Sequence, residues 1–133
     1  MKKLLLLLPV LAILGFSCNS EKPATIPKEI TFVHTVFFWL NDSVTMEDRA
    51  YFEEGLVELG KVPSIAEYYY GKPAGTDRGV VDNSYDYAWI VHFANAADQD
   101  EYQEDPIHLE FIEKYNHLWE EVKVYDTILE TGD

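Results

Sequence analysis

The stretch from Ile30 to Leu40 consists largely of β-branched and aromatic residues and predicts a strand that is apolar on both faces. Alternation along the strand sets Phe32, His34, Val36, Phe38 and Leu40 against Val33, Thr35, Phe37 and Trp39. Leaving several such side chains in water, at ~1.5–3 kcal/mol each, would cost an amount comparable with a domain's net stability of ~5–15 kcal/mol. The fold must therefore cover both sides of this strand.

After the first strand the chain predicts a helix and three further strands. Thr45 with Asp48 forms a capping-box pattern, which begins a helix that ends at about Gly60. Further strands are predicted over 65–70, 85–93 and 122–129, with a loop over 71–84. The third strand presents on one side Tyr85, Tyr87, Trp89, Val91 and Phe93.

Two helical segments precede the last strand. Asn95 and Asp98 cap a short helix that runs to about Glu104, and Asp105-Pro106 begins another, with proline at its favoured first position. Residues at spacings of three and four share a face of the second helix: His108, Phe111, Ile112, Tyr115 and Trp119. The order βαββαβ predicts an α+β ferredoxin-like sandwich.

Two principal helices cover only one side of a four-stranded sheet, so the second apolar face needs another partner. Packing against the sheet of an identical subunit is the simplest cover, and it would form a dimeric α+β barrel. The alternative is an exposed aromatic patch on a monomer.

The first residues are typical of an export signal. Lys2 and Lys3 precede an apolar run from Leu4 to Phe16, which is shorter than the ~20 residues that cross a bilayer. With Ser17 before Cys18, the segment resembles a bacterial lipoprotein signal, in which the cysteine is acylated, although Gly15 stands where leucine is usual. Cleavage by an ordinary signal peptidase would instead leave a free thiol. We therefore expect a signal peptide over 1–17, a lipidated cysteine and tether over 18–29, and a domain over 30–130, exported and anchored to a bacterial membrane.

The composition restricts the partners of the domain. The formal charge is −14, and removal of residues 1–17 takes away two lysines and no acid, which makes it −16. Such a surface repels nucleic acids and anionic lipids, so we expect no nucleic-acid partner and membrane attachment through the lipid alone. Cys18 is the only cysteine, so the fold has no internal disulfide.

The chain from about residue 30 to 130 resembles the stress-responsive A/B barrel family, also called the dimeric α+β barrel domain. The resemblance rests on the strand Ile30-Thr-Phe-Val-His34-Thr-Val-Phe-Phe, the Val62-Pro63 turn with Gly71 beyond it, the strand Tyr85-Asp-Tyr-Ala-Trp-Ile-Val-His-Phe93, the segment Tyr102-Gln-Glu-Asp105-Pro106-Ile-His108 and the closing Val124-Tyr125-Asp126. The family commonly has histidine where this chain has Asp105. Membership would imply a dimeric barrel, while the activities of members range from polyketide cyclases to unknown roles.

In cyclase members, positions similar to His34, Tyr102 and His108 line a pocket and perform acid/base chemistry. An imidazole titrates near neutrality and a phenol can hold a developing oxyanion, as an aldol closure requires. The cyclase pattern also has a tyrosine on the first helix, and the position corresponding to it is Gly55. The structural alternative is that both histidines are satisfied core residues and that Tyr102 buries its ring.

Three functions remain open from the sequence. The first is binding of a small apolar or aromatic ligand in a pocket lined by Phe38, Phe52, Phe111 and Trp119, and the second is acid/base catalysis by His34 and His108. The third is a structural or stress-protective role, which a pocket filled by side chains would favour. His92 and His117 have no neighbour at metal-ligand spacing, and no phosphate-binding loop follows a strand, so we expect neither metal nor cofactor.

Overall fold

The computed structural model describes residues 29–130, so the expected signal peptide, Cys18 and residues 19–28 of the tether lie outside the described range. The elements in chain order are β1 (Phe32–Leu40), α1 (Met46–Leu59), β2 (Glu67–Gly71), β3 (Tyr87–Phe93), α2 (Ala96–Glu104), α3 (Pro106–Tyr115), the 3₁₀ turn η1 (Asn116–Leu118) and β4 (Trp119–Ile128). Within 29–130, no helix has the length and apolar character needed to cross a membrane.

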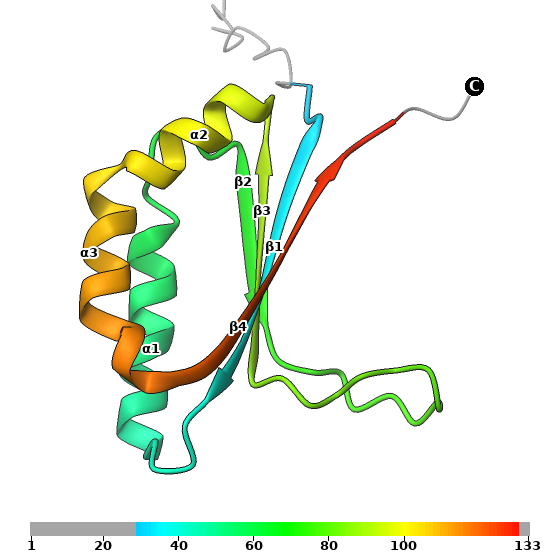
Figure 1. Cartoon of the computed structure of the whole chain (residues 1–133), viewed down its shortest axis with the longest axis vertical. Coiled ribbons are helices and arrows are strands. Elements are labelled where there is room, and N and C mark those ends of the chain that lie inside the picture. Colours follow the sequence, from blue (N-terminus) through cyan, green and yellow to red (C-terminus); the bar gives the residue numbers. More distant parts are fainter. Residues whose placement is uncertain (1–28, 131–133) are drawn as a thin grey trace, which may run out of the picture.

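The four strands form one antiparallel sheet in the order β2-β3-β1-β4. All three α-helices lie on one side of this sheet, and the other side faces away from them (Figure 1). This arrangement confirms the α+β ferredoxin-like sandwich predicted from the order of the elements.

The strand β1 occupies a central place in the sheet, and its inner residues supply part of the core. Residues along β1 are alternately buried and half-buried. The buried residues are Phe32, His34, Val36, Phe38 and Leu40. The inner face of β3 contributes Tyr87, Trp89, Val91 and Phe93, none of them measurably exposed. The helices close the core over these residues with Phe52, Leu56, Leu59, Tyr102, Phe111 and Tyr115.

The helices begin where the capping residues predict. The Thr45 side chain accepts from the Asp48 amide while Asp48 Oδ2 accepts from the Thr45 amide, which completes the capping box of α1. Asn95 caps α2, and Asp105 caps α3 by accepting from the Ile107 amide at 2.7 Å. The break between α2 and α3 at Asp105 therefore arises from a residue that ends one helix and starts the next.

Two placements differ from the sequence prediction. Trp119 is the first residue of β4 rather than part of the second helix, because α3 ends at Tyr115 and η1 follows. Tyr85 precedes β3 instead of starting it, and its ring lies 4.8 Å from that of Phe37. Since Phe37 occupies an outward position of β1, Tyr85 lies on the outer face of the sheet and not with Tyr87 on the inner face.

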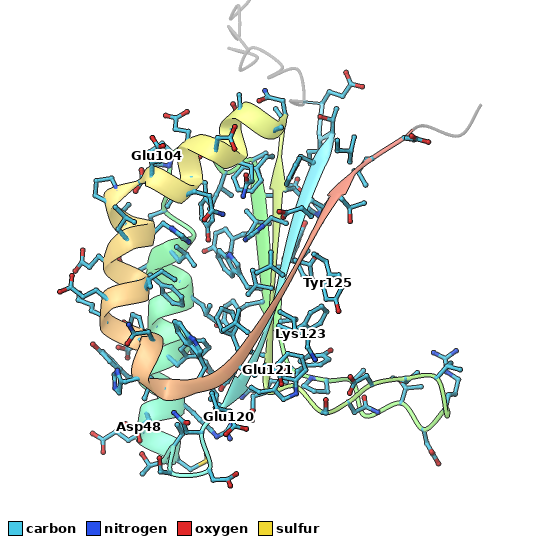
Figure 2. The ribbon with its side chains drawn as sticks, viewed as in Figure 1. Asp48, Glu104, Glu120, Glu121, Lys123 and Tyr125 are labelled. Carbon is cyan, nitrogen blue, oxygen red and sulfur yellow. The ribbon has the colours of Figure 1, made fainter. Side chains whose placement is uncertain are left out.

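The outer face of the sheet carries apolar and aromatic side chains that no helix covers. Phe37 and Trp39 are half-buried on β1, and Tyr69 and Tyr125 are 56% and 57% exposed on the two edge strands. Figure 2 shows Tyr125 and Lys123 directed away from the helices. The face that the sequence predicted to need a partner is thus open in the single chain.

Candidate functional site

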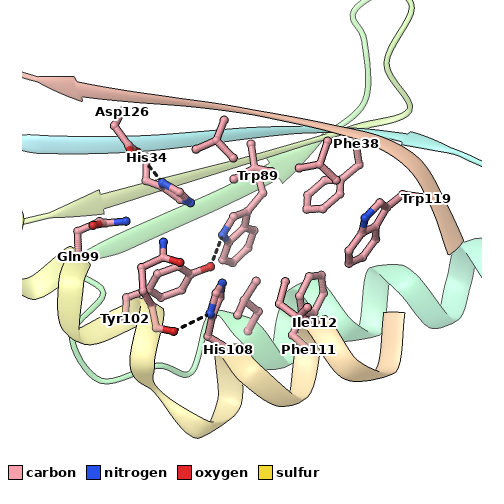
Figure 3. Close-up of a pocket in the computed structure, with 15 residues that line it drawn as sticks. His34, Phe38, Trp89, Gln99, Tyr102, His108, Phe111, Ile112, Trp119 and Asp126 are labelled. Carbon is pink, nitrogen blue, oxygen red and sulfur yellow. Dashed lines mark hydrogen bonds and ion pairs between the residues drawn. The ribbon is translucent and has the colours of Figure 1, made fainter. Parts of the chain in front are cut away.

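A cavity of about 390 Å³ lies between the inner face of the sheet and the helices α2 and α3. Its polar wall consists of His34, Gln99, Tyr102, Gln103, His108 and Asp126, and its apolar wall of Val36, Phe38, Leu59, Trp89, Phe111, Ile112, Trp119, Val122 and Val124. The β4 residues on its rim are well exposed, at 49% for Val124, so the cavity opens to solvent along that strand. Figure 3 shows the polar side chains gathered at one end and the aromatic rings of Phe38 and Trp119 at the other.

His34 projects from the inner face of β1 and is 4% exposed. The antiparallel register places it opposite Asp126 of β4, and its Nδ1 lies 2.6 Å from Asp126 Oδ1. Because an ionised carboxylate only accepts hydrogen bonds, Nδ1 carries the proton of this contact. This contact selects the tautomer whose other ring nitrogen, Nε2, is an acceptor, and Nε2 lies on the cavity side (Figure 3).

Tyr102 lies between the two histidines of the site and is 1% exposed. Its ring centroid is 5.8 Å from that of His34 and 4.5 Å from that of His108. Burial raises the pKa of Tyr102 well above its ordinary value, although the hydrogen bond from Trp89 Nε1 to the phenol oxygen, at 3.3 Å, opposes this shift. Tyr102 therefore keeps its proton and remains a hydrogen-bond donor at neutral pH.

His108 stands in the first turn of α3, next to Tyr102 at the end of α2, because the chain turns sharply at Asp105-Pro106. Its Nδ1 lies 3.2 Å from the carbonyl oxygen of Gln103, so Nδ1 donates. Burial lowers the pKa of His108, the neighbouring His34 adds to the decrease, and Gln103 and Asp105 oppose it. The neutral ring thus keeps Nε2 unprotonated.

The three side chains form a defined pattern of donors and acceptors. The imidazoles of His34 and His108 each use Nδ1 in a protein hydrogen bond, which leaves Nε2 as an acceptor or base. Among residues 29–130 no acceptor is found for the hydroxyl hydrogen of Tyr102, so that hydrogen can bind a carbonyl or alkoxide oxygen in the cavity. The polar end can therefore accept two hydrogen bonds and donate one.

The structure brings together His34, Tyr102 and His108, the three residues suggested for chemistry. Of the four aromatic residues expected to line the pocket, Phe38, Phe111 and Trp119 do so. The expectation for Phe52 is corrected: it does not line the cavity but is fully buried in the core behind it, 5.2 Å from Phe38 by ring centroid.

Four residues in or next to the polar end of the cavity are not predicted as site residues from the sequence: Trp89, Gln99, Gln103 and Asp126. Gln99 precedes Tyr102 by three residues, so helical periodicity places the two on one face. Alternation along β4 likewise groups Val122, Val124 and Asp126. Only the β1–β4 register shows that Asp126 faces His34, and a strand pattern does not contain that information.

Gly55 occupies the position on α1 where the cyclase pattern has a tyrosine. It is buried, and a Cβ atom at this position would lie 2.5 Å from ring atoms of Tyr115. The ring of Tyr115 packs there against Tyr51, Phe52 and Phe111. A side chain at residue 55 would therefore displace the Tyr115 ring, and Tyr115 does not line the cavity itself.

The cavity is open and is not filled by side chains, which is the opposite of what a purely structural role would favour. Within the described part of the chain, no three His, Cys, Asp or Glu side chains converge on a point where a metal ion could bind.

The model of the Stress Responsive A/B Barrel Domain family matches residues 32–129. Comparison with curated proteins gives no match by sequence. Similar solved structures include a hydroxynitrile lyase from Passiflora edulis, with a TM-score of 0.68 and 20% identity over 80% of this chain and 99% of the other. A dimeric ferredoxin-like protein of unknown function from Thermobifida fusca has a TM-score of 0.63 and 20% identity over 77% of this chain and 93% of its own.

A dimeric protein of unknown function with a ferredoxin-like fold from Bacteroides fragilis has a TM-score of 0.60 and 19% identity, covering 74% of this chain and 96% of its own. At these identities the likeness concerns the fold. The fold that contains the cavity therefore also occurs in proteins described as dimeric.

Proposed function

The chain belongs to the stress responsive A/B barrel domain family, and on this basis we propose that it is a homodimeric protein whose cavity binds a small molecule with an apolar body and a hydrogen-bonding end. The observation that carries the proposal is the division of the cavity. Six polar side chains lie at one end, and nine apolar or aromatic side chains form the rest of the wall.

The polar end favours a ligand that carries a hydroxyl group. Nε2 of His34 and Nε2 of His108 accept, and Tyr102 donates, so a hydroxyl can be bound both as donor and as acceptor. The rings of Phe38, Phe111 and Trp119 provide a surface for an alkyl chain or an aromatic ring.

A pair of probes tests ligand binding. Because Trp89 and Trp119 line the cavity, 4-hexylphenol entering it should change the tryptophan fluorescence and raise the melting temperature. Hexylbenzene, which has the same body without the hydroxyl, should bind more weakly. Failure of both probes, each used up to its solubility limit, to change fluorescence or melting temperature would contradict this binding function.

Two matched variants locate the probe. In His108→Phe the preference for 4-hexylphenol over hexylbenzene should shrink by about 3–10-fold, the value of one hydrogen bond of ~0.5–1.5 kcal/mol. In His92→Phe, on the outer face of the sheet opposite Glu67, the preference should not change. Equal losses in the two variants would place the probe outside the cavity.

A second candidate function is acid/base catalysis, and the contact between His34 and Asp126 favours it. A carboxylate on Nδ1 orients the ring and stabilises the imidazolium that forms when Nε2 accepts a proton. In this reaction Nε2 takes a proton from carbon next to a carbonyl, the electron pair moves onto the carbonyl oxygen, and the Tyr102 hydroxyl hydrogen-bonds the enolate. The imidazolium then exchanges this proton with solvent, and Nε2 delivers a solvent proton to the same carbon.

Exchange of deuterium from D₂O into the carbon next to the carbonyl of valerophenone measures this activity directly by NMR. The protein should accelerate the exchange, and Tyr102→Phe should slow it by about 10²–10³-fold if the phenol stabilises the enolate. Exchange that is no faster than in buffer, or unchanged in His34→Ala and His108→Ala, would reject catalysis while leaving ligand binding in place.

The proposed homodimer has its own support, and we extend the proposal to a membrane anchor. The uncovered outer sheet face and the dimeric neighbours support the dimer, with the two sheets packed face to face. The basic and apolar start of the chain before Ser17-Cys18 supports acylation at Cys18. An alkyne analogue of palmitate should label the wild-type chain and not Cys18→Ala; label retained in Cys18→Ala would refute the anchor.

A further inference from the structure

The loop between β2 and β3 projects from the sheet on the side opposite the helices (Figure 1). We propose that this loop, residues 72–86 and called the arm below, clasps the second copy of the chain and fixes how the two copies are oriented in the dimer. The inference rests on the proposed dimer and assigns the arm a role within it.

Both ends of the arm are tied to the body of the chain. At its start, Lys72 Nζ lies 2.7 Å from Glu53 Oε1 of α1. At its end, Asp86 accepts from Arg49 of α1 at 2.8 Å and from the amide of Leu40 at 2.8 Å. These contacts fix the direction in which the arm leaves the sheet.

The arm is also ordered internally. The Val81 amide donates to the Arg78 carbonyl at 2.9 Å, and the side-chain amide of Asn83 donates to the Thr76 carbonyl at 3.0 Å. At the turn, Val80 is 93% exposed, an apolar side chain displayed where nothing in the same chain covers it among the described residues. An arm ordered before binding loses little conformational entropy when it docks.

A notch of about 400 Å³ lies where the arm meets the outer face of the sheet, lined by Phe37, Trp39, Asp82, Tyr85, Lys123 and Tyr125. Trp39 Nε1 donates to Ser84 Oγ at 3.0 Å and so holds the arm against β1. The Phe37 and Tyr125 rings lie 6.0 Å apart beside it. The notch is thus continuous with the apolar face that the dimer would cover.

Geometry makes a second copy the occupant that fits. Packed sheets lie ~10 Å apart, whereas an out-and-back loop of about fifteen residues reaches up to ~25 Å. A partner on the outer face therefore either contacts the arm or is blocked by it. The notch and the exposed Val80 provide complementary surfaces for such a contact, one concave and aromatic and the other convex and apolar.

Charge opposes the approach of a second copy and does not by itself select the occupant. Each copy has a formal charge of −14, with 24 acidic and 10 basic residues, so two copies repel one another. Arg78 lies on the arm, two residues from the exposed Val80, where it would offset part of this repulsion, although Asp77 and Asp82 lie on the same arm.

Photo-crosslinking tests the contact in the full chain in intact cells. The photoreactive residue p-benzoylphenylalanine is placed at Val80 and, as a matched control, at Met46, an apolar residue 83% exposed at the start of α1. Cells that co-express copies with two different epitope tags should yield doubly tagged dimers from position 80 and none from position 46. Crosslinks from position 80 only within one chain, or only to another protein, would overturn the proposal.

A second measurement uses sedimentation equilibrium of the full chain carrying Cys18→Ser, which removes the proposed acyl group. Val80→Asp should raise the dimer dissociation constant by about 10-fold or more, and Met46→Asp should leave it unchanged. A wild-type monomer would refute the dimer and the arm together. A wild-type dimer that Val80→Asp does not weaken would refute the arm alone.

Discussion

At the scale of single residues, Asp126 gives the site its most definite chemistry. Its carboxylate lies 2.6 Å from Nδ1 of a histidine that is 4% exposed, while its own side chain is 47% exposed. The hydrogen bond therefore links a buried ring to a solvent-accessible acid. Such a ring has few other ways to satisfy Nδ1, so Asp126 supports the fold as well as the site.

Removal of this acceptor should destabilise the protein. Asp126→Ala leaves the Nδ1–H of His34 without its partner, and an unsatisfied buried donor costs ~1–3 kcal/mol in unfolding free energy. Urea unfolding followed by circular dichroism measures the loss. Glu121→Gln, on the same strand and in an exposed pair with Lys123, should cost less than ~0.5 kcal/mol; equal costs for the two variants would show that Asp126 is a surface carboxylate without a structural role.

His108 should make stability depend on pH in a predictable direction. Burial lowers its folded-state pKa below the ordinary value of 6.5, so the unfolded chain binds this proton more tightly than the folded chain. The contribution to stability is present above pH 6.5 and is lost as the pH falls from 6.5 toward the lower folded-state pKa. Unfolding free energy measured from pH 7.5 to 5 should therefore fall less in His108→Gln than in the wild type.

The control for this titration is His117, an exposed residue of η1. His117→Gln should keep the pH dependence of the wild type, because both proteins retain the buried imidazole of His108. A pH profile that is identical in wild type and His108→Gln would mean that His108 titrates alike in the folded and unfolded chains.

At the scale of elements, the sequence predicted which segments form and which face each one buries, but not where neighbouring elements meet. Alternation identified the inner positions of β1, and Thr45, Asn95 and Asp105 marked the helix starts, because both signals are local. Trp119 was misplaced because a helical spacing of four from Tyr115 continues through the 3₁₀ turn into β4. Phe52 was misplaced because an inward position does not distinguish core from cavity wall.

The contact between α1 and α3 at Gly55 provides a test at this scale. Alanine raises helix propensity by ~1 kcal/mol over glycine, but its Cβ at residue 55 would lie 2.5 Å from the Tyr115 ring. That ring is confined by Phe52 and Phe111, and overpacking of this kind costs ~1–3 kcal/mol. We expect Gly55→Ala to destabilise the protein in thermal unfolding.

A double-mutant cycle separates the clash from other effects. With Tyr115→Leu in place the ring is absent, so Gly55→Ala should become neutral or stabilising, with a coupling energy of ~1–3 kcal/mol. Gly55→Ala that stabilises the protein with Tyr115 intact would show that α1 and α3 are not in close contact there.

At the scale of the whole molecule, the dominant fact is an apolar sheet face on a chain of formal charge −14. The apolar surface favours association and the charge opposes it, so the proposed dimer would depend on a limited set of contacts on that face. The need for a partner could be argued from the first strand alone, because both of its faces are apolar. The arm could not, since glycine and proline over 71–84 predict a loop but not the side of the sheet from which it projects.

Tyr125→Glu tests the outer face as the dimer interface. Tyr125 is 57% exposed on β4, so the substitution removes little packing within one chain, and its unfolding free energy should change by less than ~0.5 kcal/mol. In the dimer the same residue would bring a carboxylate onto an apolar interface between two chains that are both strongly acidic. Sedimentation equilibrium should show a dissociation constant at least ~10-fold higher. The matched variant Leu109→Glu, 56% exposed on α3 of the helical side, should dimerise as the wild type does. If Leu109→Glu dissociates the dimer and Tyr125→Glu does not, the copies associate through their helices, and the open sheet face needs a different explanation.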